Sequence, residues 1–286
     1  MRASLRWIAN AWCLPAVMVV GGCSQTPVID STVVDRVRTT VGPEHAPHVA
    51  ARWSDDKIYM HVAGSGTFIA PGLLVTCAHV VLEPHDDVFI NGKRVASVTL
   101  ARGKVPPTTP GQVPEINKPQ YHSGEADYDW TILGLEPGVT PDPLPYIVDR
   151  GYRPAVGQTI VLAGRPIGDQ MRTVDQRVVE TAFVLVAAMV IEQCPAEVVR
   201  GAFVAALPTR FDLVGMSGGP ALAYDGQRGT LVLFGITCAT VTNEVMGITV
   251  NRHAVVRTLT FLDEAAATWK PDGTNNALPS MRPLAR

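Results

Sequence analysis

The chain has 286 residues, which is enough for one large or two small domains. Hydrophobic residues make up 47% of it and charged residues 17%, a composition that allows a sizeable core and argues against intrinsic disorder. The 24 basic and 26 acidic side chains give a formal net charge of -2 and form no block of like charge. We therefore expect no nucleic-acid-binding surface.

The N-terminal residues 1–22 have the pattern of an export signal. Two arginines precede an apolar stretch from Trp7 to Val20, which is short for a membrane span and ends in two glycines before Cys23. This ending resembles the bacterial lipobox, in which the cysteine receives lipid and becomes the new N-terminus; a plain signal or an uncleaved anchor is the alternative. We expect a lipoprotein signal peptide, a membrane contact through lipidated Cys23, and an exported lipoprotein at the periplasmic face of a membrane or at the cell surface.

The next segment, residues 23–47, is polar and mixed, and predicts a tether. From His48 onward strands dominate, and Lys57–Val62 alternates polar with apolar residues as a half-buried strand does. Pro71-Gly72 fits the centre of a type II turn between two strands. Asn91-Gly92 predicts a second hairpin.

The later part of the chain continues this strand-rich pattern. Residues 101–128 predict a long polar loop before the apolar strand Trp130–Leu135, and Pro137–Pro145 predicts a linker. A helix is expected at Ala254–Ala267, and residues 266–286 form a polar tail. Further strands are predicted at Thr159–Ala163, Val178–Ile191, Ala202–Leu207, Thr230–Thr237 and Met246–Val250.

The cysteines allow one disulfide at most. Of the five, Cys13 lies in the signal and Cys23 is the predicted lipid site. Cys77, Cys194 and Cys238 remain, and the sequence leaves all three pairings open.

Three short motifs contain residues that could carry chemistry. His79 lies in Thr-Cys-Ala-His after a predicted strand, and Asp129 immediately precedes another. Ser217 lies in Gly-Met-Ser-Gly-Gly-Pro, where glycines permit a sharp turn and the amides of Gly215 and Ser217 could converge on an oxyanion. Each motif alone also fits a packed core histidine, a turn aspartate or an ordinary glycine-rich loop. Asp127 competes with Asp129, which we prefer because it adjoins the apolar strand.

Together the motifs TCAHVV, DWTIL and GMSGGP resemble the chymotrypsin family, over roughly residues 48–262. The nearest relatives are the Deg-type (HtrA-like) bacterial proteases, and the chain order His, Asp, Ser is the one the family uses. The resemblance implies an all-β fold of two six-stranded antiparallel β-barrels with a C-terminal helix. The protease domain would span residues 48–265, with the first barrel at about 48–145 and the second at about 146–262.

The resemblance also implies a function, that of a serine endopeptidase acting on proteins or peptides. Ser217 would be the nucleophile, His79 the base and Asp129 the acid that orients it, with no metal and no organic cofactor. An uncharged specificity pocket for small to medium aliphatic side chains would be lined by Phe211, with Asp212 as the competing floor residue, and by Cys238, Gly247 and Thr249. The sequence departs from the family in having Val80 where many members have cysteine, and in leaving too few residues for the PDZ domain of Deg-type proteases.

Three alternatives were weighed against this interpretation. A catalytically silent protease-like fold could act as a surface binding module, but such a decayed site would be expected to have lost a triad member. An α/β-hydrolase elbow would take Asp225 and His253 as partners of Ser217, but Gly-Gly-Pro cannot readily start the helix that must follow. A zinc site from Cys77, His79 and another cysteine lacks a paired C-x-x-C.

Overall fold

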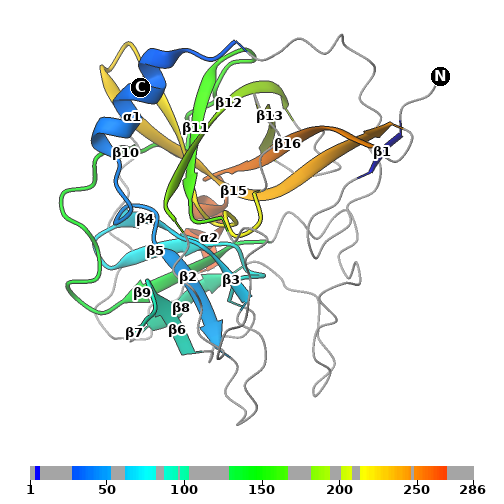
Figure 1. Ribbon diagram of the computed structural model, residues 1–286. Coiled ribbons are helices and arrows are strands. Elements are labelled where there is room, and N and C mark those ends of the chain that lie inside the picture. Colours follow the sequence, from blue (N-terminus) through cyan, green and yellow to red (C-terminus); the bar gives the residue numbers. More distant parts are fainter. Residues whose placement is uncertain are drawn as a thin grey trace.

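Two β-barrels lie side by side in the computed structural model (Figure 1). It describes residues 4–6, 28–52, 62–81, 87–95, 97–102, 129–166, 182–193, 201–207, 213–245 and 248–268. Helix α1 (Ser31–Thr40) lies on the second barrel, and helix α2 (Phe261–Thr268) follows the last strand.

The first barrel consists of two four-stranded antiparallel sheets, in the orders β3-β2-β6-β7 and β4-β5-β9-β8. Only Gly66 separates β3 from β4, so these two form one bent strand that joins the sheets, and β8 begins two residues after the last residue of β7. The turns predicted at Pro71-Gly72 and Asn91-Gly92 are confirmed, with φ of 73° at Gly72 and of 50° and 75° at Asn91 and Gly92. The strands are β2 (His48–Arg52), β3 (Val62–Ser65), β4 (Thr67–Ala70), β5 (Leu73–Thr76), β6 (Asp87–Ile90), β7 (Lys93–Val95), β8 (Ser97–Arg102) and β9 (Thr131–Leu135).

The second barrel has the order β15-β14-β11-β12-β13-β16 and closes through the pairing of β15 with β16. Its strands are β11 (Thr159–Gly164), β12 (Val184–Gln193), β13 (Ala202–Ala206), β14 (Pro220–Asp225), β15 (Thr230–Val245) and β16 (Ile248–Thr258). Short β1 (Ser4–Arg6) and β10 (Ile147–Val148) pair with β15 outside the closed barrel. The predicted fold class of two antiparallel barrels is confirmed.

Large apolar side chains fill both barrels. Phe68, Leu74 and Ile132 are fully buried in the first, and Leu162 and Phe234 in the second. Each such side chain stabilises the fold by about 1.5–3 kcal/mol. The barrels therefore form a rigid frame for the loops between their strands.

Helix α1 is the largest difference from the sequence-based expectation, because it lies within the segment expected to be a tether. Its Asp30 N-cap accepts a hydrogen bond from the Thr32 amide at 2.9 Å, and the Asp30 amide donates to Thr159 Oγ1 of β11 at 2.8 Å. Only Val33 and Val37 are buried on its inner face. Two valines make an apolar stripe too narrow for the helical period to stand out in the sequence.

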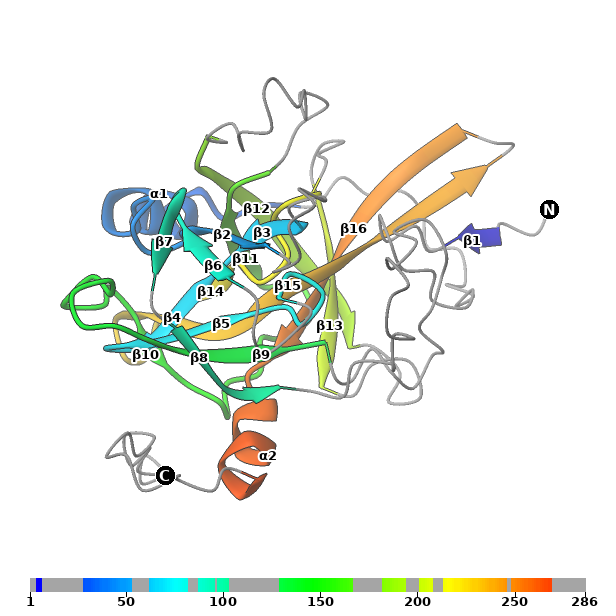
Figure 2. The same ribbon diagram turned by 90° about the horizontal axis from the view of Figure 1, so that it is seen from below.

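The C-terminal segment also differs from expectation. Residues 254–258, expected to be helical, continue strand β16, because Ala254–Arg257 pair with β13 on one side and Ala254–Thr258 with β15 on the other. The helix begins only at Phe261 and lies beside β8 of the first barrel (Figure 2). Strand β14 was not predicted, since its first residue is a proline, which is tolerated only at such a position.

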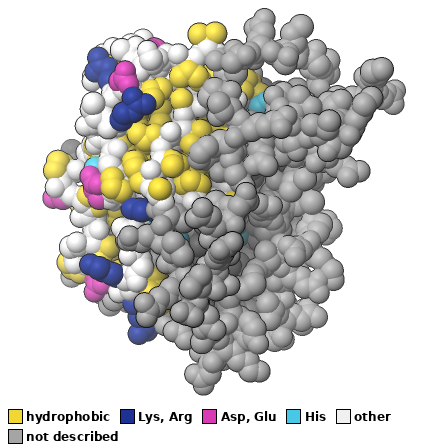
Figure 3. Space-filling view, viewed as in Figure 1, with side chains coloured by type: hydrophobic (Ala, Val, Ile, Leu, Met, Phe, Trp, Pro, Cys, Tyr) yellow, Lys and Arg dark blue, Asp and Glu magenta, His cyan; other side chains and the backbone are white. Residues whose placement is uncertain are grey.

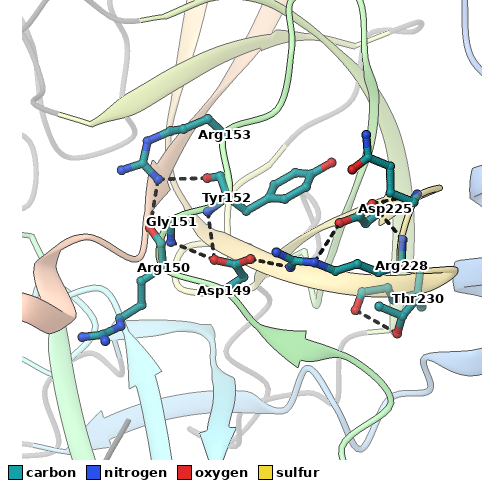
Figure 4. Close-up of polar contacts among 10 residues, drawn as sticks. Asp149, Arg150, Gly151, Tyr152, Arg153, Asp225, Arg228 and Thr230 are labelled. Carbon is teal, nitrogen blue, oxygen red and sulfur yellow. Dashed lines mark hydrogen bonds and ion pairs between the residues drawn. The ribbon is translucent and has the colours of Figure 1, made fainter. Parts of the chain in front are cut away.

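A polar network ties the segment between the barrels to the second one (Figure 4). The Asp149 carboxylate accepts hydrogen bonds from the Gly151 amide at 2.9 Å, the Tyr152 amide at 3.0 Å and Arg228 Nη1 at 2.6 Å. Burial acts to raise the pKa of Asp149, but these partners outweigh it and lower the pKa. The network fixes the chain after β10 against the β14–β15 hairpin.

The described surface is mixed in character. Figure 3 shows apolar side chains on the second barrel beside α1, with charged side chains at their border. Among the described residues, no helix is both long and apolar enough to cross a membrane.

Candidate active site

The structure brings His79 and Asp129 together at the end of the first barrel. His79 follows β5 and Asp129 precedes β9, and these strands pair with Thr76 opposite Thr131. His79 Nδ1 lies 2.8 Å from Asp129 Oδ2, and the His79 amide donates to Asp129 Oδ1 at 3.0 Å. This pairing places the ring hydrogen on Nδ1 and makes Nε2 the basic nitrogen.

The electrostatic surroundings of Asp129 favour its carboxylate form. Burial acts to raise the pKa of Asp129, but the charge and hydrogen bonds of His79, together with the charge of Arg257, outweigh it. The pKa of Asp129 is therefore lower than usual. An ionised carboxylate at this place stabilises an imidazolium on His79.

Ser217 lies on a tight turn between β13 and β14, as the glycines predicted. Gly215 and Gly218 have φ of 89° and 86°, a conformation that glycine adopts without strain. The Met216 amide donates to Leu213 O at 2.8 Å and the Gly219 amide to Met216 O at 2.9 Å. Within the part of the chain that the structure describes, the amides of Gly215 and Ser217 donate to no acceptor.

The glycines after Ser217 also allow the turn to approach its neighbours closely. A Cβ atom at Gly218 would lie 2.3 Å from Ser65 O and 2.4 Å from Thr76 Oγ1. A Cβ atom at Gly219 would lie 2.2 Å from Ala163 O. No side chain fits at either position, because Gly218 packs against the first barrel and Gly219 packs against β11 of the second.

Gly64 lies between the Ser217 turn and the loop after β5, which contains His79 and Val80. A Cβ atom at Gly64 would lie 2.7 Å from Ser217 O and 2.6 Å from Val80 Cγ2, so both loops meet at Gly64. The Ser65 amide donates to Ser217 O at 2.8 Å. Residues of the two barrels thus meet where the sequence predicted a catalytic centre.

Only some of the predicted specificity-pocket residues lie in the part of the chain that the structure describes. Cys238 lies in β15 and is half-buried, and Thr249 lies in β16. The other specificity-pocket residues Phe211, Asp212 and Gly247, the lipid site Cys23, and Asp127 and Cys194 fall outside the described residues. The composition of the specificity pocket stays a prediction.

Cys77 and Cys238 are free thiols, and the Cys77 sulfur lies within 4.8 Å of ligand atoms of His79 and Asp129. Cys77 is fully buried, and its sulfur lies 3.5 Å from Thr237 O. Burial, followed by the hydrogen bond with Cys238, raises the pKa of the Cys77 thiol. Cys77 and Cys238 therefore contact each other as two free thiols, which is one of the three pairings that the sequence leaves open.

A metal could draw ligands from Cys77, His79 and Asp129, whose candidate ligand atoms lie within 4.8 Å of one another. However, His79 Nδ1 and Asp129 Oδ2 form a hydrogen bond with each other. In addition, the raised pKa of the Cys77 thiol disfavours the thiolate that a metal requires. The arrangement suits an acid–base pair better than a metal centre.

Sequence reasoning missed three residues of this site. Ser65 and Thr67 of the first barrel contact the Ser217 turn, and Arg257 of β16 is buried near Asp129. The Gly-Ser-Gly-Thr pattern at residues 64–67 was the only available signal. Nothing in the sequence around Arg257 distinguishes it from a surface arginine.

Comparison with known proteins identifies the family of the chain. The chain matches the model of the trypsin-like peptidase domain over residues 64–232. No curated protein matches it.

A solved structure with a TM-score of 0.50 has a similar fold. The chain is similar to the active form of the Rv3671c protease from M. tuberculosis, with a TM-score of 0.50 and 17% identity over 87% of this chain and 93% of that one. The inactive form of that protease gives a TM-score of 0.48 and 17% identity over 85% and 98% of the two chains. A scabies mite inactivated protease paralogue gives a TM-score of 0.47 and 15% identity over 82% of this chain and 96% of that one. Since the family model covers more than half of the sequence, the chain belongs to the family of trypsin-like peptidase domains.

Proposed function

We propose that this protein is a serine endopeptidase in which Ser217, His79 and Asp129 form the catalytic triad. The observation that carries the proposal is the 2.8 Å His79–Asp129 pair next to a turn whose Gly215 and Ser217 amides have no acceptor among the described residues. A paired imidazole and two open amides are what acyl transfer to a serine requires.

The proposed reaction proceeds in two stages. His79 Nε2 takes the Ser217 hydroxyl proton as Oγ attacks the carbonyl carbon of a peptide bond, and the Gly215 and Ser217 amides bind the resulting oxyanion. His79 then gives its proton to the leaving amine, which departs and leaves an acyl group on Ser217. A water molecule, activated by His79 in the same way, releases the acid and restores the serine.

The alternative of a silent, binding-only protease-like fold has less support. Loss of function would free Asp129 and His79 from any constraint on their geometry, yet the two residues keep both hydrogen bonds. The turn also has glycine at the two positions with positive φ, 215 and 218, and at the tightly packed positions 218 and 219. These features support an active enzyme.

The proposal extends to substrate and location. Proteins or peptides with small to medium aliphatic side chains before the cleaved bond are the proposed substrates, on the assignment of Phe211 rather than Asp212 to the pocket floor. We also propose that the protein is exported and held at a membrane by lipid on Cys23, because small residues and a cysteine end the apolar N-terminal stretch.

Covalent labelling with a fluorophosphonate probe tests the proposed catalysis. The wild-type protein should be modified at Ser217, and Ser217→Ala should lose both labelling and peptide cleavage, by roughly a million-fold in rate constant. Ser97→Ala, in a strand of the first barrel, is the matched control and should be labelled normally. Modification at another serine, or cleavage retained by folded Ser217→Ala, would refute the assignment.

A further inference from the structure

A segment of the first barrel donates hydrogen bonds to the carbonyl groups of the Ser217 turn. Three carbonyls of this turn accept hydrogen bonds from two residues of the segment Ser65–Thr67. Ser65 Oγ donates to Gly215 O at 2.9 Å, the Ser65 amide to Ser217 O at 2.8 Å and Thr67 Oγ1 to Gly218 O at 2.7 Å. All three bonds cross from one barrel to the other.

Ser65 is itself held in place from several sides. It is fully buried, its hydroxyl accepts from the Arg165 amide at 2.9 Å, and its carbonyl accepts from Thr76 Oγ1 at 2.8 Å. A Cβ atom on Gly164 would lie 2.9 Å from Ser65 Oγ, so the hydroxyl has little space to move. With its acceptor role filled by Arg165, the hydroxyl has its single hydrogen available for Gly215 O.

The orientation of these carbonyls decides where the amides of the turn point. In a trans peptide the C=O and N–H bonds point in opposite directions. The Met216–Ser217 peptide is fixed because Met216 O accepts from the Gly219 amide, which leaves the Ser217 amide on the opposite side. The Gly215–Met216 peptide is held at both ends, because Gly215 O accepts from Ser65 Oγ and the Met216 amide donates to Leu213 O. The Gly215 amide belongs to the preceding peptide, so Ser65 acts on it by holding the Gly215 backbone in place.

We propose that Ser65 is a positioning residue for the oxyanion-binding amides: its hydroxyl holds the Gly215 carbonyl from the opposite barrel and so fixes the place of the Gly215 backbone, whose amide we assign to the oxyanion. The inference rests on the proposed function. Ser65 touches no reacting atom and acts through Gly215. Without its hydroxyl the peptide after Gly215 loses one of the two hydrogen bonds that hold it, so the Gly215 backbone can shift and its amide leaves the oxyanion position for part of the time.

Thr67 offers a matched comparison. It lies on the same strand segment, is fully buried, and donates a bond of the same kind to the same turn. Its acceptor is Gly218 O, beyond the nucleophile and away from the Gly215 amide. Loss of either hydroxyl removes the hydrogen bond to one carbonyl of the turn and destabilises the protein, and loss of the Ser65 hydroxyl also removes an acceptor of the Arg165 amide. Only loss of the Ser65 hydroxyl disturbs the oxyanion donors.

The test compares the kinetics of Ser65→Ala and Thr67→Val. Active sites are counted by fluorophosphonate titration, so that unfolded protein is excluded from the enzyme concentration. We expect Ser65→Ala to lower kcat per titrated site by about ten- to a hundredfold with KM nearly unchanged, since one oxyanion donor is worth about 10²–10³. The inhibition constant of a peptide aldehyde, whose hemiacetal oxygen occupies the oxyanion position, should rise by the same factor as kcat/KM falls. Thr67→Val should lose less than about threefold in kcat at a similar loss of stability.

Each other outcome decides against the inference. Unchanged kcat and aldehyde affinity in titrated Ser65→Ala would reduce Ser65 to a structural residue, as would equal losses in both variants. If Ser65→Ala does not fold, Ser65→Cys, which keeps a weak donor, should show the same split between kcat and KM on a smaller scale, and a wild-type kcat there would overturn the inference. Failure of the wild-type protein to be labelled at Ser217 is a separate result, which removes the proposed function and this inference with it.

Discussion

At the residue scale, Asp129 is held by two hydrogen bonds from a single partner. The side chain and the amide of His79 each bind one carboxylate oxygen. Asparagine at this position would present an amide N–H group to one of these donors and so favour the wrong imidazole tautomer. We expect Asp129→Asn to lower kcat by about ten-thousand-fold, and Asp127→Asn to have a mild effect. Kinetics on the two variants decide between the aspartates, and a severe loss confined to Asp127→Asn would overturn the assignment.

The same substitution changes acid stability. Because the pKa of folded Asp129 is lower than usual, its carboxylate contributes stability above the unfolded pKa of about 3.9, and this is lost as the pH falls through the folded value. Wild-type protein should therefore lose stability on acidification below about pH 4 more steeply than Asp129→Asn, by at most about 1.4 kcal/mol per pH unit. Urea unfolding at several pH values measures this difference, and parallel pH curves would contradict it.

The sequence identified His79, Asp129 and Ser217 because each stands in a short motif with an ordered spacing. It could not identify Ser65 or Thr67, whose partners lie 150 and 151 residues away in the chain. A hydroxyl that binds a distant carbonyl leaves no local pattern, because any buried serine or threonine between small residues looks the same.

At the element scale, helix α2 reaches from the end of the second barrel to the acid of the first. Its first residue, Phe261, stacks on Trp130, with ring centroids 5.0 Å apart and planes at 19°, and Trp130 directly follows Asp129. Arg257 of β16 lies over the Phe261 ring, with its Cζ 5.5 Å from the ring centroid. The aromatic pair therefore joins the C-terminal segment to the backbone that carries Asp129.

Truncation of this aromatic contact should affect both stability and catalysis. Phe261→Ala should cost about 3–5 kcal/mol in free energy of unfolding and, by loosening Trp130 beside Asp129, lower kcat by about tenfold. Leu262→Ala, at a buried neighbour on the same helix, should cost about 2–5 kcal/mol and leave kcat of the folded protein near wild type. Denaturant unfolding and active-site-titrated kinetics separate the two effects. A kcat that falls equally in both variants would show a general loss of packing instead.

Most strands of the barrels and the two predicted turns followed from local patterns, whereas strand β14 and the ends of the last strand and helix did not. Val255 and Val256 lie in an apolar stretch that fits a helix or a buried strand equally well. Pairing with β13 and β15 decides in favour of the strand. Such a choice depends on partners far away in the sequence, so periodicity alone could not make it.

At the scale of the whole molecule, the two barrels are held together across the site itself. The residues that join them, Ser65, Thr67 and Gly218, are also those that surround the nucleophile. Relative movement of the barrels would therefore shift Ser217 against His79. Contacts that hold the two barrels together are thus also contacts of the proposed catalytic centre.

Helix α1 fixes the distance between this centre and the proposed membrane anchor. The chain joins the second barrel at Asp30, whose amide bonds to Thr159, and Asp30 is seven residues after Cys23 (30 − 23 = 7). Seven residues span at most about 25 Å, far less than a tether extending to residue 47 would. A lipidated protein would thus act close to the membrane surface.

Metabolic labelling with a fatty-acid analogue tests the anchor. The wild-type protein should carry the label and fractionate with membranes, because several acyl chains on one residue hold a protein far more firmly than one. Cys23→Ala should abolish the labelling, while Cys13→Ala, within the proposed signal, should leave it unchanged. Both variants keep the protease domain intact, so fluorophosphonate reactivity of the accumulated protein should not differ between them. A soluble mature protein that begins at a residue other than Cys23, or equal labelling of the two variants, would show that the apolar N-terminal stretch is not a lipoprotein signal.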